Sequence, residues 1–387
     1  MNQKYLLRDV STRLSSGKAI SSDLLYENGK FPVYGGNGLR GFADIKNFVG
    51  ECVIVGRQGA YCGNVNYFSG EAYMTEHAVV ICCNDKVYTK YLYYLLSIMN
   101  LGRLSGQSAQ PGLSVKVLGE QEIVLPDIKT QKNIADMLYS LENKIHKNID
   151  INNNLQAQIN SIYNYWFTQF NFPNESNQPY SFAGGKMVWN DLLKQNIPEN
   201  WSVKCVLDIL SWQSNSQPPK SMFIYEPKDG YIRFIQNRDY DSDEYKTYIP
   251  KSKSLTLCNS RDILIDKYGD AGRVRYGLDG AFNVALAKLN LHDTLFLEYV
   301  RCYFESEPIY NYLHSSCMAS TRASLNESNI GNLYIVIPPQ DILNKFNSII
   351  NPIRDKILMS KDENRKCISL RNWLLPMLMN GQATIEE

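Results

Sequence analysis

The amino-acid sequence predicts an α+β protein: two mixed α/β globular domains, separated by two long antiparallel coiled-coil helices, in a pseudo-twofold internal repeat. The first observation is a duplicated spacing. From Leu113 to Pro126 and from Leu325 to Pro338, a Leu, a Gly, an Ile and a Pro follow at the same intervals. The second observation is that each Pro precedes a long polar segment with heptad-spaced apolar residues. The copies lie more than two hundred residues apart, whereas a solenoid repeat is only about 20 to 50 residues long.

Weaker sequence similarity between the two copies extends the repeat towards the N-terminal side of each. The segment from Glu51 to Gly63 resembles that from Asp262 to Gly272, and Lys90-Tyr91-Leu92 resembles Glu298-Tyr299-Val300. The order along the chain is therefore globular domain, long helix, globular domain, long helix. We predict a first globular domain over 1–128, a first long helix over 129–170, a linker over 171–198, a second globular domain over 199–339, and a second long helix with a tail over 340–387.

The first long helix is predicted from a segment without Gly or Pro between Pro126 and Pro173. Its seam positions advance in alternating steps of four and three residues, which is the pattern of a coiled coil. Two of them are Asn, and these fix the register if a polar residue lies opposite; a loosely packed, hydrated stretch is the alternative. The predicted seam is Ile134, Leu138, Leu141, Ile145, Asn148, Asn152, Leu155, Ile159, Ile162 and Trp166.

The second long helix has a seam in the same phase, with a polar pair at the same place. Arg371 takes an apolar position, where we expect Leu370 to cover it. Pro352 and Pro376 should each kink or bound the helix, so regular helix is expected over about 355–375. The predicted seam is Phe346, Ile350, Ile353, Ile357, Ser360, Asn364, Cys367, Leu374 and Leu378.

Two such helices would hold the globular domains at a fixed spacing. About 38 helical residues at about 1.5 Å each reach roughly 57 Å. A plain dimerisation coiled coil is the alternative, but it gives no reason to duplicate the globular domain with its helix. Beside the seam, Leu141, Ile162, Tyr163 and the run from Tyr165 to Phe167 add apolar surface beyond what two helices can bury. We expect that surface to dock partner subunits.

Composition excludes several classes of protein. The net charge is +1 and the hydrophobic fraction is 44%, so a nucleic-acid-binding role would need local basic patches or partner subunits. The nine Cys include no Cys-x-x-Cys pair, and the four His are scattered, so neither a zinc site nor a disulfide framework has the right spacing. No apolar run approaches the roughly 18 residues that span a membrane. We therefore expect a cytoplasmic protein without a membrane partner.

Enzyme motifs are also missing from the sequence. Gly184-Gly185-Lys186 lacks the flanking residues of a phosphate-binding loop. The glycines from Gly35 to Gly41 follow a strand-like segment but do not open a helix, as a dinucleotide-binding fold requires. No Asn-Pro-Pro-aromatic or Asp-Pro-Pro-aromatic tetrapeptide of an amino-methyltransferase occurs. We expect a non-catalytic chain that binds no cofactor or metal itself.

The strongest functional signal is a set of Gly-rich loops with Arg, Lys, Gln, Asn and Tyr, repeated in both domains. Arg reads guanine through two hydrogen bonds, Asn and Gln read adenine, and hydroxyl groups hold phosphates. A solvated surface role is at least as common for any one of these residues, but recurrence in both domains favours DNA. The candidate DNA-binding residues are Tyr34, Asn37, Arg40, Arg57, Gln58, Gln107, Gln110, Lys220, Arg233, Gln236, Arg238, Lys267, Tyr268, Arg273 and Arg322.

Several segments, in a fixed order and combined with the two long helices, point to one family. They are Phe31-Pro32-Val33-Tyr34-Gly35-Gly36-Asn37-Gly38, Ser108-Ala109-Gln110-Pro111-Gly112-Leu113-Ser114, Pro179 to Trp189, Ile197-Pro198-Glu199-Asn200-Trp201, and Tyr231-Ile232-Arg233-Phe234-Ile235-Gln236. In these segments, and over nearly all its length, the chain resembles the specificity subunits of type I restriction-modification systems.

The resemblance implies two target-recognition domains, each reading one half of a split double-stranded DNA site, with the helices setting the gap. It further implies two modification (methyltransferase) subunits docked along the helices and restriction (motor and nuclease) subunits. S-adenosylmethionine, ATP and Mg would then bind to those partners, and this chain would be a non-catalytic selector. Two alternatives remain open: a self-contained DNA-modifying enzyme, and an assembly scaffold without DNA contact.

Overall fold

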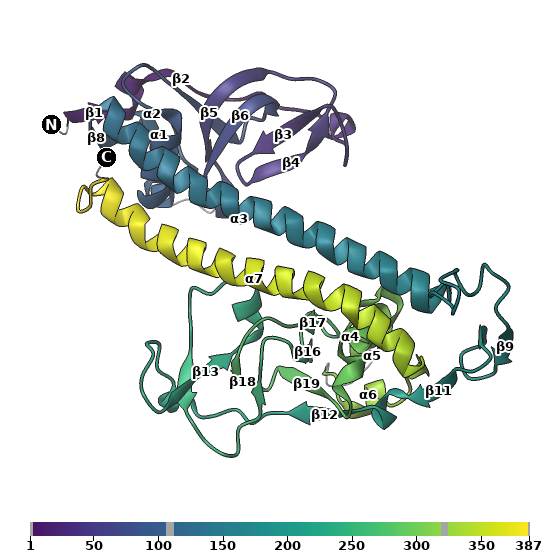
Figure 1. Ribbon diagram of the computed structural model, residues 1–387. Helices are drawn as coiled ribbons and strands as arrows, with labels where there is room; N and C mark the ends of the chain where they lie inside the picture. The colour runs from purple at the N-terminus through teal and green to yellow at the C-terminus, as the bar shows by residue number, and fades with distance from the viewer. Residues whose placement is uncertain (1–2, 106–111, 319–323, 386–387) are drawn as a thin grey trace. The chain divides into compact units, whose positions relative to one another are not determined.

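The computed structural model describes residues 3–105, 112–318 and 324–385. The chain divides into two compact units. The first comprises Met1–Ile145 and Cys367–Glu387, and the second comprises His146–Lys366. The long helices are α3 (Ile128–Tyr163) and α7 (Gln340–Met379), each a continuous ribbon in Figure 1. Each unit therefore holds one globular domain together with part of both long helices, and the predicted α+β class is confirmed.

The globular part of the first unit is a six-stranded sheet with the strand order β2-β7-β5-β6-β3-β4. Neighbouring strands are antiparallel except β3 and β6, which are parallel. The sheet strands are β2 (Ser11–Ser16), β3 (Phe31–Gly35), β4 (Gly38–Ala43), β5 (Phe48–Gly56), β6 (Val65–Met74) and β7 (Ala78–Cys83). The remaining elements are the antiparallel pair β1 (Gln3–Leu6) and β8 (Glu122–Leu125), with helices α1 (Thr89–Ile98) and α2 (Val115–Gly119).

Strand β5 lies between two clusters of buried side chains, because successive residues of a strand point to opposite faces. Val53 and Val55 belong to the cluster that contains α1 and the start of α3, whereas Cys52 and Ile54 belong to a cluster on the other face. The first cluster also includes residues from the end of α7, among them Leu378. The first domain is thus held to both long helices through a single apolar core.

The second unit repeats this topology in two smaller sheets. Their orders are β12-β19-β16-β17 and β14-β13-β18-β15, which correspond to the first unit if two long strands are each broken, β5 into β15 and β16 and β6 into β17 and β18. The strands are β12 (Leu210–Ser214), β13 (Tyr231–Ile235), β14 (Tyr248–Pro250), β15 (Leu257–Cys258), β16 (Ile263–Asp266), β17 (Val274–Arg275), β18 (Gly280–Phe282) and β19 (Leu286–Leu291). The pairing of β13 with β18 is parallel, as is that of β3 with β6.

The rest of the second unit consists of short strand pairs and helices. Two antiparallel pairs are β9 (Met187–Asn190) with β10 (Gln195–Pro198), and β11 (Ser202–Cys205) with β20 (Tyr334–Ile337). The helices are α4 (Leu297–Glu305), α5 (Glu307–Met318) and α6 (Glu327–Ile330). The predicted similarity between Lys90-Tyr91-Leu92 and Glu298-Tyr299-Val300 has a structural counterpart, because Tyr91 in α1 and Tyr299 in α4 are both buried.

The residues of the predicted seam lie on the buried side of the long helices. Asp127 caps the start of α3 by accepting from the Thr130 backbone N–H at 3.0 Å. Every predicted seam residue of both helices is buried or half-buried, and none is exposed. In the second unit the helices are antiparallel, because Asn148 contacts Asn364, and Trp166, just beyond α3, lies 5.9 Å from Phe346 between ring centroids. The heptad pattern therefore identified the packed face correctly.

One of the polar seam pairs sets the register as predicted. Asn148 Nδ2 donates to Asn364 Oδ1 at 2.8 Å and to Glu363 Oε2 at 2.9 Å. The next polar positions, Asn152 and Ser360, behave differently: Asn152 Oδ1 and Ser360 Oγ are buried without a hydrogen-bond partner among the described residues. A polar residue opposite Asn148 thus satisfies it, and the second pair has the character of the loosely packed alternative.

The expectation that Pro352 and Pro376 bound the second helix, with regular helix only over about 355–375, is wrong, because α7 runs through both from Gln340 to Met379. A proline inside a helix leaves the carbonyl four residues earlier without its donor. Both prolines and the residues at those positions, Ser348 and Asn372, are exposed, so water can satisfy the free carbonyls. The seam residues on the opposite face remain packed.

Arg371 is not covered by Leu370, which is itself 44% exposed. Instead, the Arg371 guanidinium pairs with the Glu142 carboxylate of α3 at 3.4 Å. Glu142 also accepts a hydrogen bond from the Tyr94 hydroxyl of α1 at 2.9 Å. The charged residue at an apolar position is therefore satisfied by a partner on the other helix of the first unit.

The expected docking surface at the end of α3 is largely absent. After Tyr163 the chain makes a π-helical turn, Asn164–Thr168. Tyr163, Trp166 and Phe167 are buried in the core of the second unit, and the Phe167 ring lies 4.6 Å from that of Tyr299. The linker and second domain cover these aromatic side chains, which helix periodicity alone could not reveal. Tyr165 remains 41% exposed.

Candidate nucleic-acid interface

In the first unit, backbone hydrogen bonds bring together loops that are distant in sequence. The Thr75 N–H donates to the Tyr34 carbonyl at 2.9 Å, which joins the turn after β6 to the end of β3. The Arg57 N–H donates to the His77 carbonyl at 3.0 Å, which joins the loop after β5 to the same turn. The Leu113 N–H donates to the Arg57 carbonyl at 2.8 Å. Four segments, namely the end of β3, the turn after β6, the loop after β5 and the segment at Leu113, therefore meet at one end of the sheet strands.

The second unit contains the same connections at equivalent places. The Asn283 N–H donates to the Ile235 carbonyl at 2.9 Å, and the Lys267 N–H donates to the Ala285 carbonyl at 2.8 Å. The Leu325 N–H donates to the Lys267 carbonyl at 3.0 Å. The backbone scaffold is shared by the two units, whereas the side chains it presents differ. That combination suits two readers of different base sequences.

Glycines allow the tip between β3 and β4 to approach its neighbours. A Cβ at Gly36 would lie 3.1 Å from the His77 carbonyl oxygen, and Gly38 has a φ of 88°, a left-handed conformation that favours glycine. A Cβ at Gly35 would lie 2.6 Å from the Arg40 side chain. The tip is therefore held close to the loop that carries Arg57, with Asn37 exposed on it.

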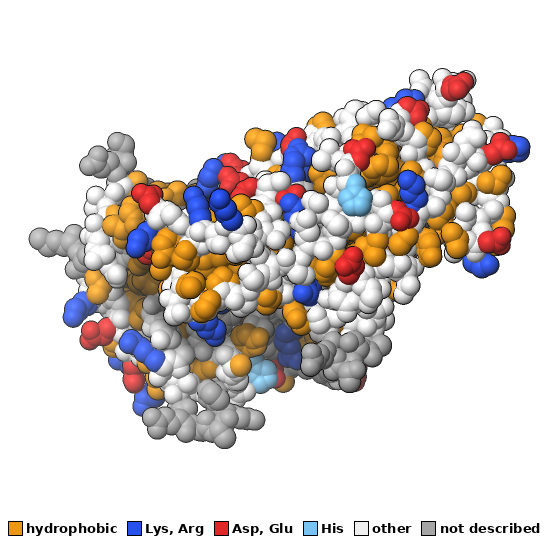
Figure 2. Space-filling model, turned by 90° about the horizontal axis from the view of Figure 1, so that it is seen from below, with side chains coloured by type: hydrophobic (Ala, Val, Ile, Leu, Met, Phe, Trp, Pro, Cys, Tyr) orange, Lys and Arg blue, Asp and Glu red, His pale blue; other side chains and the backbone are white. Residues whose placement is uncertain are grey.

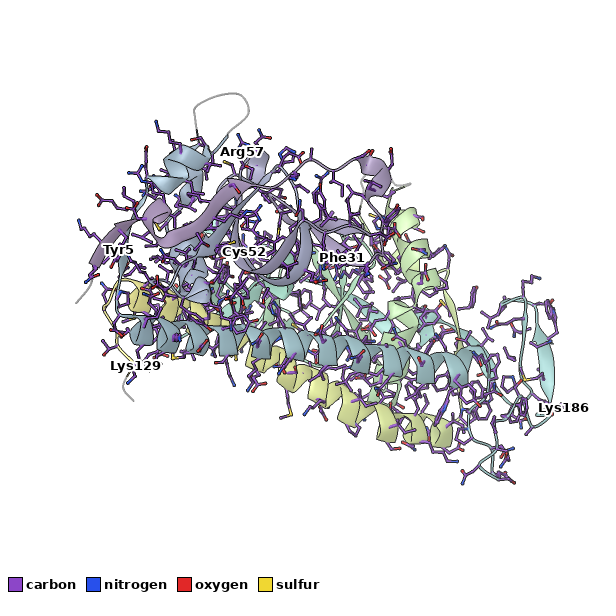
Figure 3. The ribbon with its side chains drawn as sticks, turned by 90° about the horizontal axis from the view of Figure 1, so that it is seen from above. Tyr5, Phe31, Cys52, Arg57, Lys129 and Lys186 are labelled. Atoms are coloured by element: carbon purple, nitrogen blue, oxygen red, sulfur yellow. The ribbon has the colours of Figure 1, made fainter. Side chains whose placement is uncertain are left out.

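The predicted residues of the first unit fall into two groups. Asn37, Arg40 and Gln58 are exposed, and Figure 3 shows Arg57 at the outer edge of the first unit, just after the strand that contains the buried Cys52. Arg57 Nη1 also donates to the Ser16 hydroxyl at 3.3 Å. Tyr34 is half-buried with its ring 4.9 Å from that of Phe68, and burial raises its pKa. By packing against Phe68 of β6, the Tyr34 ring thus stabilises the tip between β3 and β4.

In the second unit, two candidate DNA-binding side chains, those of Arg233 and Gln236, bond to other residues of the protein. The Arg233 guanidinium pairs with Asp243 and with Asp239 at 3.7 Å, and its side chain is only 17% exposed. Gln236 Nε2 donates to the Thr247 hydroxyl at 3.0 Å. A base contact by either residue would require these bonds to break, so their DNA contacts stay a prediction. Arg238, by contrast, is exposed.

The loop between β16 and β17 presents the other predicted cations. Tyr268 is exposed, and the Lys267 amine lies 5.9 Å from the centre of its ring. Arg273 pairs with Asp270 at 2.9 Å, and the Tyr310 hydroxyl donates to Asp270 at 2.6 Å. Burial raises the pKa of Asp270, but these two donors outweigh it and the pKa is lowered. Arg273 is therefore oriented by a carboxylate that stays ionised.

Three predicted residues, Gln107, Gln110 and Arg322, lie outside the described residues, so their roles remain predictions. Lys220 is exposed in a separate short turn, Lys220–Met222, after β12. The sequence analysis missed His77 and Asn283, which sit in the turns that join the loops of each unit. Alignment of the two repeats over these turns would have been the only signal.

The described part of the chain contains no group of three His, Cys, Asp or Glu residues suited to a metal ion. None of its helices combines the length and apolarity needed to cross a membrane. The nine cysteines are free thiols. Figure 2 shows Lys and Arg side chains interspersed with Asp and Glu side chains on the face it displays.

The loops and the duplicated topology define a protein with two similar recognition domains. A family model described as "Type I restriction modification DNA specificity domain" matches residues 2–161 and 198–365. The chain therefore belongs to the family of type I restriction-modification DNA specificity domains. Each matched range covers one globular domain with all or much of its long helix.

Relatives and a solved structure agree with this assignment. The type I restriction enzyme MjaIX specificity subunit of Methanocaldococcus jannaschii is 28% identical over 322 residues, 78% of this chain and 71% of the relative. The EcoprrI specificity subunit of Escherichia coli is 38% identical over 130 residues, 33% of this chain and 32% of the relative. The crystal structure of a type I restriction-modification S subunit from M. genitalium has a TM-score of 0.69 at 15% identity, covering 100% of this chain and 97% of that chain. That structure shows the same fold.

Proposed function

We propose that this chain reads a bipartite double-stranded DNA site, one half with the loops of each unit, and thereby directs the methyltransferase and restriction subunits of a type I system. The observation that carries the proposal is the repeated scaffold. Equivalent backbone hydrogen bonds hold Arg57, which precedes Gln58, in the first unit and Lys267, which precedes Tyr268, in the second. Equal scaffolds with unequal side chains would place two different readers on DNA in the same way.

The long helices supply the second part of the proposal. No residue of their predicted seam is exposed, and Asn148 pairs with Asn364, which would favour one register. A fixed register would fix the gap between the half-sites. Helix packing of this kind tolerates insertion of whole heptads, since these preserve the seam.

Partners and cofactors follow from the family. Relatives are named as specificity subunits of type I restriction enzymes, and we propose that two modification subunits and the restriction subunits assemble with this chain in the cytoplasm. S-adenosylmethionine, ATP and Mg would bind to those subunits, and this chain would be non-catalytic. With a net charge of +1, the partners would share the phosphate contacts that hold the duplex.

The experiment is a binding selection with a library of bipartite duplexes, using the full chain together with its modification subunits. Wild type should select two half-sites separated by a fixed gap. The variant R57A/Q58A should alter base preference in one half-site only, by about 1 to 3 kcal/mol for each bidentate contact, and K267A/Y268A should alter only the other. Selection of no sequence by a folded complex would favour an assembly scaffold, and methyl transfer by the isolated chain would favour a self-contained enzyme.

A further inference from the structure

A polar cavity of about 400 Å³ lies inside the second unit, beside the loop between β16 and β17. One wall is α3, which contributes the amide side chains of Asn153, Gln156 and Asn160. The loop contributes Arg273, and α7 contributes Lys361. Amide and cationic side chains of these types are the usual ligands of DNA phosphates.

Lys361 is the cation without a carboxylate partner in this cavity. Its amine lies 4.0 Å from the centre of the Tyr276 ring, and no carboxylate of the described residues forms an ion pair with it. Burial and, to a smaller extent, the neighbouring Arg354 lower its pKa to about 8, although the nearby Glu305 carboxylate acts in the opposite direction. The ammonium form therefore lacks a compensating anion.

The charges behind the cavity are also out of balance. Arg301 and Arg354 are fully buried and share Glu298, at 3.2 and 2.9 Å. Glu305, which itself lines the cavity, lies 3.6 Å from Arg354. These two cations and Lys361 therefore face two carboxylates, which leaves one positive charge in excess. An anion entering the cavity would offset the cost of burying that charge.

We propose that this cavity receives one backbone phosphate of the DNA bound by the second unit, contacted by Lys361 and by the amides of Asn153 and Asn160. The inference rests on the proposed function. A phosphodiester carries a single negative charge, which matches the excess. The loop between β16 and β17, which contributes Gly272 and Arg273 to the lining of the cavity, also carries the candidate DNA-binding residues Lys267 and Tyr268.

Variants can test the site with little change in the fold. K361Q removes the positive charge. N160D adds a negative charge while keeping the bond in which Gln156 Nε2 donates to Oδ1 of residue 160 at 2.9 Å. The matched control is K366Q on the same helix, because Lys366 is exposed and pairs with Asp362 at 2.7 Å.

Binding of the complete complex to its specific duplex would be measured over a range of salt. In K361Q the slope of log affinity against log salt should fall by about 0.9, with about a fivefold loss of affinity at 0.15 M salt. Base preferences in both half-sites should stay unchanged, since a phosphate contact carries no sequence information. N160D should weaken binding at least as much, and K366Q should match wild type.

Proton uptake provides a readout that a merely structural role would not move. A phosphate beside Lys361 would favour its ammonium form, so wild type should take up protons on binding DNA at pH 8, and K361Q should not. Calorimetry in buffers of different ionisation enthalpy measures this uptake. The charged and titratable groups that face Lys361 are Arg354 and Arg365 on α7, Arg301 and Glu305 on α4, and Tyr276 after β17.

The outcomes separate this inference from the proposed function. If the wild-type complex binds its site but K361Q and N160D bind with the same affinity, slope and proton uptake, the phosphate site is wrong and the proposed function stands. If K361Q loses its modification subunits instead of DNA affinity, the cavity is a protein contact and the inference also fails. Absence of DNA binding by the wild-type complex would overturn both.

Discussion

The two units fasten their globular domains to the long helices at equivalent positions, but with opposite charges. The repeat relates Leu113 to Leu325, a shift of 325 − 113 = 212 residues, and the same shift relates Glu142 to 142 + 212 = 354, which is Arg354. Glu142 on α3 contacts Tyr94 of its domain and Arg371 of α7. Arg354 on α7 contacts Glu298 of its domain and Gln156 of α3.

The environments of these two residues differ as much as their charges. The ion pair of Arg354 with Glu298 in the second unit is buried, because Arg354 is fully buried and Glu298 is 1% exposed. In the ion pair of Glu142 with Arg371 in the first unit, the Arg371 side chain is 30% exposed. Arg354 also donates to the Tyr276 hydroxyl at 2.8 Å. The duplicated architecture thus requires one polar connection from helix to domain and to the opposite helix, and the sequence satisfies it once near solvent and once inside the core.

The largest effect should come from breaking the buried connection. R354A leaves Glu298 with Arg301 as its one remaining ion-pair partner among the described residues and leaves Glu305 with none, so it should lower the free energy of unfolding by about 3 to 5 kcal/mol. Chemical denaturation of the full chain, followed by tryptophan fluorescence, would measure it. R365Q is the control, because Arg365 forms a partly exposed pair with Asp362 on the same helix. Equal stability of R354A and R365Q would contradict the comparison.

Acid should act selectively through the same site. Burial raises the pKa of Glu298, but Arg301 and Arg354 outweigh it and hold the pKa below its ordinary value. A lowered folded pKa means that the stabilisation is present above the unfolded pKa and is lost as pH falls through the folded pKa. The free energy of unfolding of wild type should therefore fall more steeply than that of E298Q over this acidic range. Parallel pH profiles would show that Glu298 is not the responsible group.

An intermediate effect is expected at Arg233, where the units diverge within the candidate interface. The hydrogen bond from Asn283 to Ile235 matches that from Thr75 to Tyr34, so the position of Arg233 corresponds to Pro32. R233A should cost about 1 to 3 kcal/mol, because Asp239 loses a buried partner. Thermal unfolding would detect this loss, and the selectivity of binding by the folded variant would show whether Arg233 reads a base.

The smallest effect belongs to the first unit. E142Q keeps an acceptor for the Tyr94 hydroxyl and removes the charge that faces Arg371, so it should cost about 1 kcal/mol or less. Added salt should narrow the difference between E142Q and wild type, since a partly exposed pair is screened. A loss as large as that of R354A would mean that the two connections are energetically equivalent, which their burial does not predict.

The long helices were predictable from sequence because a heptad pattern reports directly on a packed face. Ile134, Leu138 and Ile357 are buried where the alternation of four and three residues placed them. The course of α7 through Pro352 was not predictable, because it depends on the solvent exposure of Ser348 and not on local propensity. The π-helical turn after Tyr163 likewise depends on tertiary packing.

The candidate interface was predictable only in part. Residue types and glycines singled out loops that the structure brings together, since Gly36 and Gly38 are needed where the tip approaches the turn at His77. The ion pairs of Arg233 with Asp239 and Asp243 could not be predicted, because they depend on how the chain folds after β13 and not on a local sequence pattern. Lys361 lies on a helix whose pattern gave no reason to single it out, and only the folded second unit places it in a cavity.

The central claim is that two independent readers are joined by helices of fixed register. The most direct test inserts one heptad after Ile145 in α3 and one after Lys366 in α7, where the two units divide, so that each unit keeps its own contacts. Mapping of the bases methylated by the assembled complex should show both half-sites unchanged and a gap longer by at most about three base pairs, since seven helical residues rise about 10 Å. Altered half-sites with an unchanged gap would contradict the account.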